Sequence, residues 1–501
     1  MARSSRVGRF AFREETVAHT CLGLQNNSRK MIDIEKAIQI IKKANPFMGW
    51  LLNCEEPLID YCKKYITRHE FASEHLKRQE PYKKLIQEKI EKLFKNEDIK
   101  VNFDGGLILD TTDHHSILNF PSTVGAHLIT RFDTIFNRKE KKDYFVLNCG
   151  NVPFNDALNK RGVQINGKHL NLYPKSTKNK LVSRYPLYKY NLMEWVNKNK
   201  KDFNESEIEF IKRLQLIIDN VDFSTCKKLS DQIIKINHKI WLEMFDPGII
   251  NDVRRCITLE HDEILIEFLT KFVLENEDNI VWKSLFDKKF REIVLKEFDG
   301  IYGAWNYYGK NSGTYFFWCF DEEDGQEYRL DLRGDVLFSP EKKARNIKLE
   351  PEDISRALNE GILIPSIFIK FATVAFYMGA KTCGGPGQTE YSGSMQKAWL
   401  KVLNISNYAK ELELSKYWSV INFNCADMAF RTKKDGKIYK EWGLDIAMNH
   451  TLTKKYIEKI SKIPIKFFIY PMIPISFYRL ASVEERKQLN IKEEDLYKDL
   501  A

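Results

Sequence analysis

The stretch GLILDTTDHH (residues 106–115) is the clearest indication of the fold in this sequence. A short apolar run that ends in a polar turn is typical of a buried strand at its carboxyl end. KDYFVLNCGNVPFND (142–156) repeats this pattern, and STVGAHLITRFDTIF (122–136) between them has helical spacing. A strand, a helix and a strand in this order predict a βαβ unit, and therefore a parallel sheet.

The pattern outward from this unit predicts an α/β protein with a Rossmann-like parallel-sheet core, a helical insertion and N-terminal helices. Helical periodicity dominates the early chain and returns after residue 190, and a glycine-rich turn follows the second mixed region. Five segments are predicted: an N-terminal helical segment (1–100), the first half of the core (101–189), the helical insertion (190–298), the second half of the core (299–402) and a C-terminal α/β extension (403–501).

The amino-acid composition indicates which binding partners and which cellular location to expect. The net charge is +10, but the lysine-rich runs carry no interleaved aromatic residues, so nucleic acid is not an expected partner. Nine scattered cysteines without a CxxC pair argue against a disulfide framework and favour a cytoplasmic location. The longest apolar stretch (361–380) is interrupted by Pro365 and Lys370, so it predicts buried core, and no membrane partner is expected.

The turn at Asp113, His114 and His115 allows three interpretations. Asp and His are ligands of zinc and manganese, so Asp113 and His114 are candidate metal ligands. Adjacent histidines in an extended chain point to opposite sides, however, and no Asp-x-Asp strand precedes them to complete a two-metal site. A proton-transfer site and a pair of histidines that cap local backbone are the other interpretations.

Two further turns have the composition of binding loops. Gly384, Gly385 and Gly387 expose successive backbone amides before a helix, which favours binding of a phosphate or an oxyanion. The turn after the second strand begins Asn148-Cys149, and its asparagines suit hydrogen bonding to a polar substrate. Cys149 has no base that the sequence positions, and an inert buried thiol is the commoner case.

These three turns, in this order, resemble the bacillithiol-pathway cysteine-adding enzymes, with this chain as a divergent relative. Thr112 to His115, with Asn119 and Pro121, match the first turn of that family, Cys149 to Asp156 the second, and Gly384 to Gln388 with Tyr391 the third. The chain departs from the family where Gly-Gln-Gln becomes Asp113-His114-His115 and where Gln388 replaces a glutamate. A homodimer is one expectation, although the family's long C-terminal coiled coil is not visible.

The resemblance implies an amino-acid ligase-like enzyme that forms an amide-type bond between an amino acid and an amine acceptor. ATP or another activated donor is implied, and without a P-loop ATP would bind in the Rossmann mode. We expect His114 or His115 to be the general base, oriented by Asp113. The expected substrate-binding residues are Thr112, Asn119, Asn148, Asn151, Asn155, Gln388 and Tyr391. The alternatives are a metal-dependent hydrolase that uses the Asp-His-His turn, and a catalytically inactive ligand-binding relative.

Overall fold

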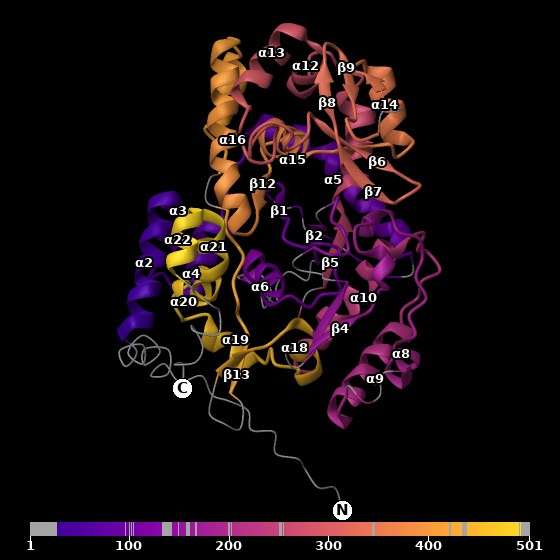
Figure 1. Cartoon of the computed structure of the whole chain (residues 1–501), viewed down its shortest axis with the longest axis vertical. Helices are drawn as coiled ribbons and strands as arrows, with labels where there is room; N and C mark the ends of the chain where they lie inside the picture. The colour runs from indigo at the N-terminus through magenta and orange to yellow at the C-terminus, as the bar shows by residue number, and fades with distance from the viewer. Residues whose placement is uncertain are drawn as a thin grey trace, which may run out of the picture.

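The centre of the molecule is a four-stranded sheet with all strands parallel (Figure 1). The computed structural model describes residues 28–491, apart from 96, 100, 102, 104, 133–142, 149, 157–160, 166–167, 199–200, 202, 250–252, 254, 343–345, 420–421, 433–437 and 490. The strand order is β12 (Lys381–Cys383), β1 (Ile108–Asp110), β2 (Tyr144–Asn148) and β5 (Cys256–Glu260). The predicted α/β class with a parallel-sheet core is confirmed.

Both faces of this sheet are largely buried, which explains why β1, β2 and β5 are mainly apolar. Successive side chains of a strand point to opposite faces. Ile108 and Val146 therefore join one hydrophobic cluster, while Leu109 and Leu147 join the other. The sheet is the middle layer between two layers of helices.

The two helical layers come from different parts of the chain. The cluster around Ile108 includes side chains from α6 (Pro121–Thr130) and α10 (Leu229–Glu243). The cluster around Leu109 includes side chains from α5 (Ser73–Leu93) and α11 (His261–Phe268). Because α6 connects β1 to β2, the predicted βαβ unit is present.

Helices from the two ends of the described chain pack beside each other, as the indigo and yellow ribbons in Figure 1 show, with α2 against α21. The N-terminal elements are α2 (Ser28–Ala44), α3 (Pro46–Leu51), α4 (Leu58–Tyr61) and the π-helix η2 (Cys62–Thr67). The C-terminal elements are α17 (Ala409–Ser415), β13 (Phe430–Thr432), β14 (Ile438–Lys440), α18 (Gly443–Asn449), α19 (Lys454–Ile460), α20 (Lys466–Ile469), η8 (Tyr470–Met472), α21 (Ile473–Leu480) and α22 (Val483–Gln488).

Two further groups of elements extend from the core. Between β2 and α10 lie β3 (Gly162–Ile165), β4 (Lys168–Asn171), η3 (Lys175–Thr177), η4 (Val182–Arg184), α8 (Leu192–Lys198) and α9 (Glu205–Asp219). Between α11 and β12 lie η6 (Leu269–Val273), α12 (Ile280–Phe286), α13 (Lys288–Glu297), β6 (Phe317–Asp321), β7 (Gln326–Arg329), β8 (Asp331–Arg333), β9 (Val336–Phe338), β10 (Asn346–Lys348), α14 (Pro351–Asn359), β11 (Leu363–Pro365), α15 (Ile367–Lys370) and η7 (Phe371–Tyr377).

Two secondary-structure elements differ from the sequence-based expectation. The range predicted as a helical insertion, 190–298, also contains the core strand β5. The helix expected to start near Tyr391 is α16 (Pro386–Ile405), which begins earlier because Pro386 suits the first turn of a helix. In the ranges that the structure describes, no helix combines the length and the apolar character needed to span a membrane.

The order of the strands creates a topological switch point. The chain proceeds from β1 to β2 to β5 in one direction, and β12 then pairs with the other side of β1. In open parallel sheets, ligands bind beyond the carboxyl ends of the strands, at the point where this direction reverses. The loops after β1 and β12 are therefore placed where a ligand is expected.

We predict that Gly125→Ala destabilises the protein, because α6 packs directly against backbone there. A Cβ atom on Gly125 would lie 1.7 Å from the carbonyl oxygen of Ala426, so the helix must shift. The free energy of unfolding, measured in urea, should fall by about 1 to 3 kcal/mol. Gly393→Ala in α16 is the matched control, because a Cβ there has open space and should be neutral or stabilise by about 1 kcal/mol. Equal effects of both changes would contradict this packing.

Candidate active site

The last residue of three core strands is polar and lies on the same face of the sheet. Asp110, Asn148 and Glu260 end β1, β2 and β5, and all three are buried. Asn148 and Glu260 are paired in the register of the parallel strands β2 and β5. Alternation along each strand directs these side chains to the face covered by α6 and α10. The carboxyl edge of the sheet therefore holds buried groups that ionise or form hydrogen bonds.

Asp110 forms a buried ion pair with His127 of α6. The Nδ1 atom of His127 lies 2.8 Å from Asp110 Oδ2, and the Thr112 hydroxyl donates to Asp110 Oδ1 at 2.6 Å. Burial alone would lower the pKa of His127, but Asp110 and, more weakly, Asp113 raise it to about 9. Burial would raise the pKa of Asp110, yet His127 and hydrogen bonds hold it below its ordinary value. His127 is therefore a cation at neutral pH.

Asp113 lies against this pair rather than against its neighbouring histidines. Its Oδ2 atom is 3.8 Å from His127 Nε2. Both carboxylate oxygens of Asp113 are buried without a hydrogen-bond partner in the described chain, as is Asn148 Oδ1. Native proteins leave few buried polar atoms unpaired, and those that occur are often at functional sites. The predicted role of Asp113, to orient His114 or His115, is thus not the contact that the structure shows.

His115 forms a second buried pair on the same face. Its Nε2 atom lies 3.2 Å from Glu260 Oε2, and its Nδ1 atom lies 3.4 Å from Asn148 Nδ2. His115 has a φ of 52°, a left-handed backbone conformation that few residues other than glycine adopt. This turn directs His115 inward, where its side chain is fully buried.

His114 pairs with Asp156 at the accessible edge of the site. Its Nδ1 atom lies 3.0 Å from Asp156 Oδ1, and the two side chains are 29% and 25% exposed. Asp156 ends the turn that follows β2, so the pair joins the loops of two neighbouring strands. A carboxylate beside an imidazole fixes the orientation and tautomer of the ring, the arrangement found in general-base histidines. His114 is thus the predicted histidine that solvent reaches.

Charged side chains that were not predicted continue the site toward the β6–β7 hairpin. Asn151 donates to Glu327 Oε2 at 2.5 Å, and Lys370 lies 2.7 Å from Asp262 Oδ1. Burial raises the pKa of Glu327 to about 7, although the hydrogen bond from Asn151 opposes the shift. A carboxyl group that titrates near neutral pH is suited to proton transfer. Gly150 is needed beside this group, because a Cβ there would lie 1.4 Å from Asp262 Oδ2.

Three of the predicted substrate-binding residues hold the fold together instead. The Gln388 carboxamide donates to the Thr382 carbonyl at 2.9 Å. In the amide orientation that satisfies both groups, Asn119 bonds the backbone of Gln164. Tyr391 stacks on Tyr302 with ring centroids 5.5 Å apart.

The remaining predicted residues divide between the site and its surroundings. Thr112 is buried and bonds Asp110, and Asn148 and Asn151 contact His115 and Glu327 as described above. Asn155 is exposed, and its backbone amide donates to Lys178. Cys149 lies outside the described residues.

The glycine turn matches the predicted anion site only in part. The Gly384 amide donates to the Asn422 carbonyl at 2.9 Å, so in this structure that amide already has a hydrogen-bond partner. Gly385 caps α16, and Gly387 lies in its first turn. A Cβ on Gly387 would lie 3.2 Å from the Arg479 guanidinium, so a cation flanks the positive end of the helix dipole. Gly385 and Gly387 remain suited to an anion. Arg479 lies beside them and also pairs with Glu390 Oε2 at 3.0 Å.

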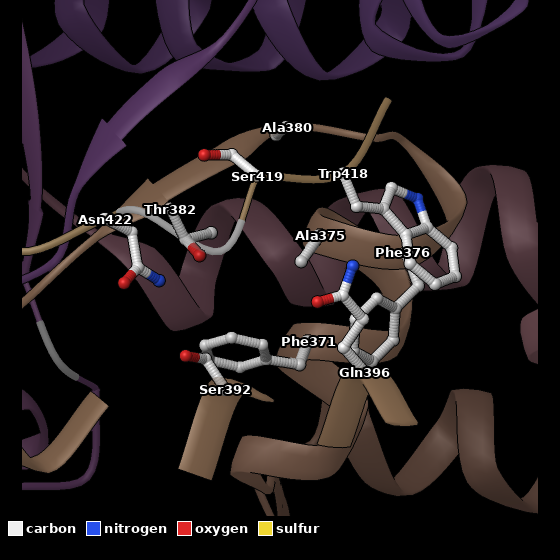
Figure 2. A pocket seen from close by; sticks show the side chains of 10 residues that line it. All are labelled: Phe371, Ala375, Phe376, Ala380, Thr382, Ser392, Gln396, Trp418, Ser419 and Asn422. Atoms are coloured by element: carbon white, nitrogen blue, oxygen red, sulfur yellow. The ribbon is translucent and has the colours of Figure 1, made fainter. Parts of the chain in front are cut away.

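A small cavity lies beside this turn, between β12, η7 and α16 (Figure 2). Thr382, Ser392 and Asn422 contribute polar groups to its wall, and Phe371 and Trp418 are among its aromatic residues. Its volume is about 20 Å³, room for one water-sized group. In this conformation the cavity does not accommodate an amino acid or a nucleotide.

The alternative metal ligands, Asp113 and His114, face different partners, His127 and Asp156. In the described part of the chain, no three side chains of His, Cys, Asp or Glu form a group that could hold a metal ion.

Comparisons of this chain with models of protein families, with curated proteins and with solved structures found no match. The resemblance to bacillithiol-pathway enzymes, and the activity that it implies, therefore stay predictions. What the fold and the site define together is an α/β protein with ionisable groups at the carboxyl edge of a parallel sheet.

We predict that His127 makes stability depend on pH in the alkaline range. Its pKa rises from an ordinary 6.5 to about 9, so the folded state binds more protons than the unfolded state between these values. Its contribution, on the order of 3 kcal/mol, is complete below pH 6.5 and is lost as the pH rises through 9. Asp110, whose pKa is lowered, loses its contribution only at acidic pH.

The measurement is urea unfolding from pH 6.5 to 9 for the wild type and for His127→Gln. The stability difference between them should shrink as the pH rises, whereas His169→Gln, at an exposed position on β4, should leave the wild-type slope unchanged. Parallel pH profiles for the wild type and His127→Gln would show that His127 is not the titrating group.

Proposed function

We propose that this chain is an enzyme that forms an amide-type bond between an amino acid and an amine acceptor, with His114 as the general base. The observation that supports the proposal best is the His114–Asp156 pair, because its imidazole is oriented by a carboxylate and is partly exposed. His115 and His127 are fully buried, so neither is as well placed to meet a substrate.

The chemistry requires a base at this position. When an amine attacks an activated acyl carbon, a C–N bond forms, the bond to the leaving group breaks, and the nitrogen must lose a proton. The His114 imidazole would accept that proton, and Asp156 would stabilise the imidazolium that results. Glu327, with a pKa of about 7, is the second group able to exchange a proton near neutral pH. It would protonate the leaving group.

The protein has groups at the topological switch point that suit the phosphate of an activated donor. Arg479 and the first turn of α16, at Gly385 and Gly387, provide positive charge and backbone amides. These groups would hold the phosphate of ATP or of an acyl phosphate. The donor phosphate would then lie at the loop after β12, and the His114 base lies on the loop after β1.

We expect His114→Ala to lower turnover by about 10²- to 10⁴-fold, the usual contribution of a general base. Asp156→Asn should lower it less and shift the acidic limb of the pH–rate profile, because the carboxylate no longer stabilises the imidazolium. The assay is a mass-spectrometric screen of amino acids with ATP and aminated acceptors, followed by rates for each variant. His169→Ala, an exposed histidine on β4, is the matched control and should keep full activity.

Unchanged turnover in His114→Ala would refute the assigned role. Binding of an amino acid without condensation in the wild type would favour the inactive ligand-binding alternative. Turnover that requires a divalent metal and releases an amine or a phosphate would favour the hydrolase.

A further inference from the structure

A second cavity lies apart from the candidate active site. Its volume is about 200 Å³, and it is enclosed by α10, by the chain that follows α5 and by the turn that follows α9. The lining residues are Phe94, Lys95, Glu97, Asn220, Val221, Asp222, Lys235, His238 and Lys239. None of them belongs to the site at the carboxyl edge of the sheet.

Lys235 lines the cavity, and its partly buried ammonium group has no counter-ion among the described residues. The residue is 7% exposed, and its Nζ atom donates to the Asp222 carbonyl at 2.7 Å and lies 5.8 Å from the centre of the Phe94 ring. In the part of the chain that the structure describes, no carboxylate lies within 4.0 Å of Lys235. An ammonium group has three donors, so two remain. Burying a charge without a partner is costly unless an opposite charge compensates it.

His238 supplies a second buried polar group in the same wall. It is 1% exposed, and its Nε2 atom lies 3.2 Å from Glu97 Oε2. Its Nδ1 atom is buried and has no hydrogen-bond partner among the described residues. Lys235 and His238 are three residues apart on α10, so the helical repeat places them on one face.

Each of the two acidic residues of the cavity already has a partner. Glu97 pairs with His238, and Arg255 is 4.0 Å away; the hydrogen bond from His238, with these charges, holds the pKa of Glu97 below its ordinary value. The Asp222 carboxylate accepts a hydrogen bond from the Ser224 amide at 2.9 Å, and the Asp222 carbonyl accepts one from Lys235 at 2.7 Å. The hydrogen bonds from Ser224 lower the pKa of the Asp222 carboxyl group, and Lys235 also lowers it, to a smaller extent. Positive charge from Lys95, Lys235 and Lys239 therefore dominates the cavity, beside the apolar surfaces of Phe94 and Val221.

We propose that this cavity binds a small organic anion, with its phosphate or carboxylate on Lys235 and its apolar body against Phe94 and Val221. The volume suits a compact ligand of a single ring. This site is separate from the proposed amide-forming centre and does not depend on it.

The test is isothermal titration calorimetry on the full chain at constant ionic strength, with phenyl phosphate, benzoate and inorganic phosphate as probes. Phenyl phosphate or benzoate should bind the wild type, and whichever binds more tightly identifies the anionic group. Lys235→Met keeps the apolar stem and should weaken binding by about tenfold or more, as loss of a charge-assisted hydrogen bond does. Lys212→Met on α9 is exposed, removes the same charge outside the cavity and should bind like the wild type.

Because removal of a buried lysine can affect folding, Lys239→Met at the partly exposed rim provides a second variant, and its affinity should fall less than that of Lys235→Met. Equal affinity of the wild type and both cavity variants would overturn the proposal. Absence of binding by all three probes would also overturn it, and equal affinity for phenyl phosphate and inorganic phosphate would overturn the apolar contact.

Discussion

The buried pair of Asp110 and His127 is the interaction on which the candidate site depends. It joins the end of β1 to α6, and Thr112 bonds the same carboxylate, so the loop that carries His114 starts from a defined position. Removing one partner of such a pair commonly costs about 3 to 5 kcal/mol, because the other charge stays buried. The left-handed turn at His115 then sends one histidine inward to Glu260 and leaves the other at the edge with Asp156.

Local sequence patterns predicted the βαβ unit of the core well. Its elements β1, α6 and β2 are consecutive in the chain, and their hydrophobic periodicity can be recognised without knowledge of residues far away in the sequence. The same patterns located the turn at residues 113–115. They did not identify the partners of its side chains. His127 comes from α6, Asp156 from the turn after β2 and Glu260 from the end of β5. A signal was present, however: each of β1, β2 and β5 ends its apolar run with one polar residue, and period-two alternation places all three on one face.

At two other positions, hydrogen bonds within the fold occupy groups that were expected to contact a ligand. Gly384 was expected to present its amide to an anion, but the chain at 422–424 runs alongside it and takes that hydrogen bond. The Gln388 carboxamide likewise has a partner within the fold, the Thr382 carbonyl of β12, because a buried carboxamide needs hydrogen-bond partners. The strand β5 was missed because five residues between long helical patterns carry little periodic signal of their own.

The place of β12 in the sheet has a consequence for how the chain folds. Beside the β1–β12 pairing, the Thr111 hydroxyl donates a hydrogen bond to the Cys383 carbonyl. These two residues are 272 positions apart in the sequence. During synthesis, β1 therefore emerges long before its second neighbour and has an open, apolar edge in the meantime. Such edges pair readily with other chains, and contacts of long sequence separation form slowly. A nascent chain that stops before β12 is thus expected to be prone to aggregation, so chaperones that cover strand edges would have most effect during this interval.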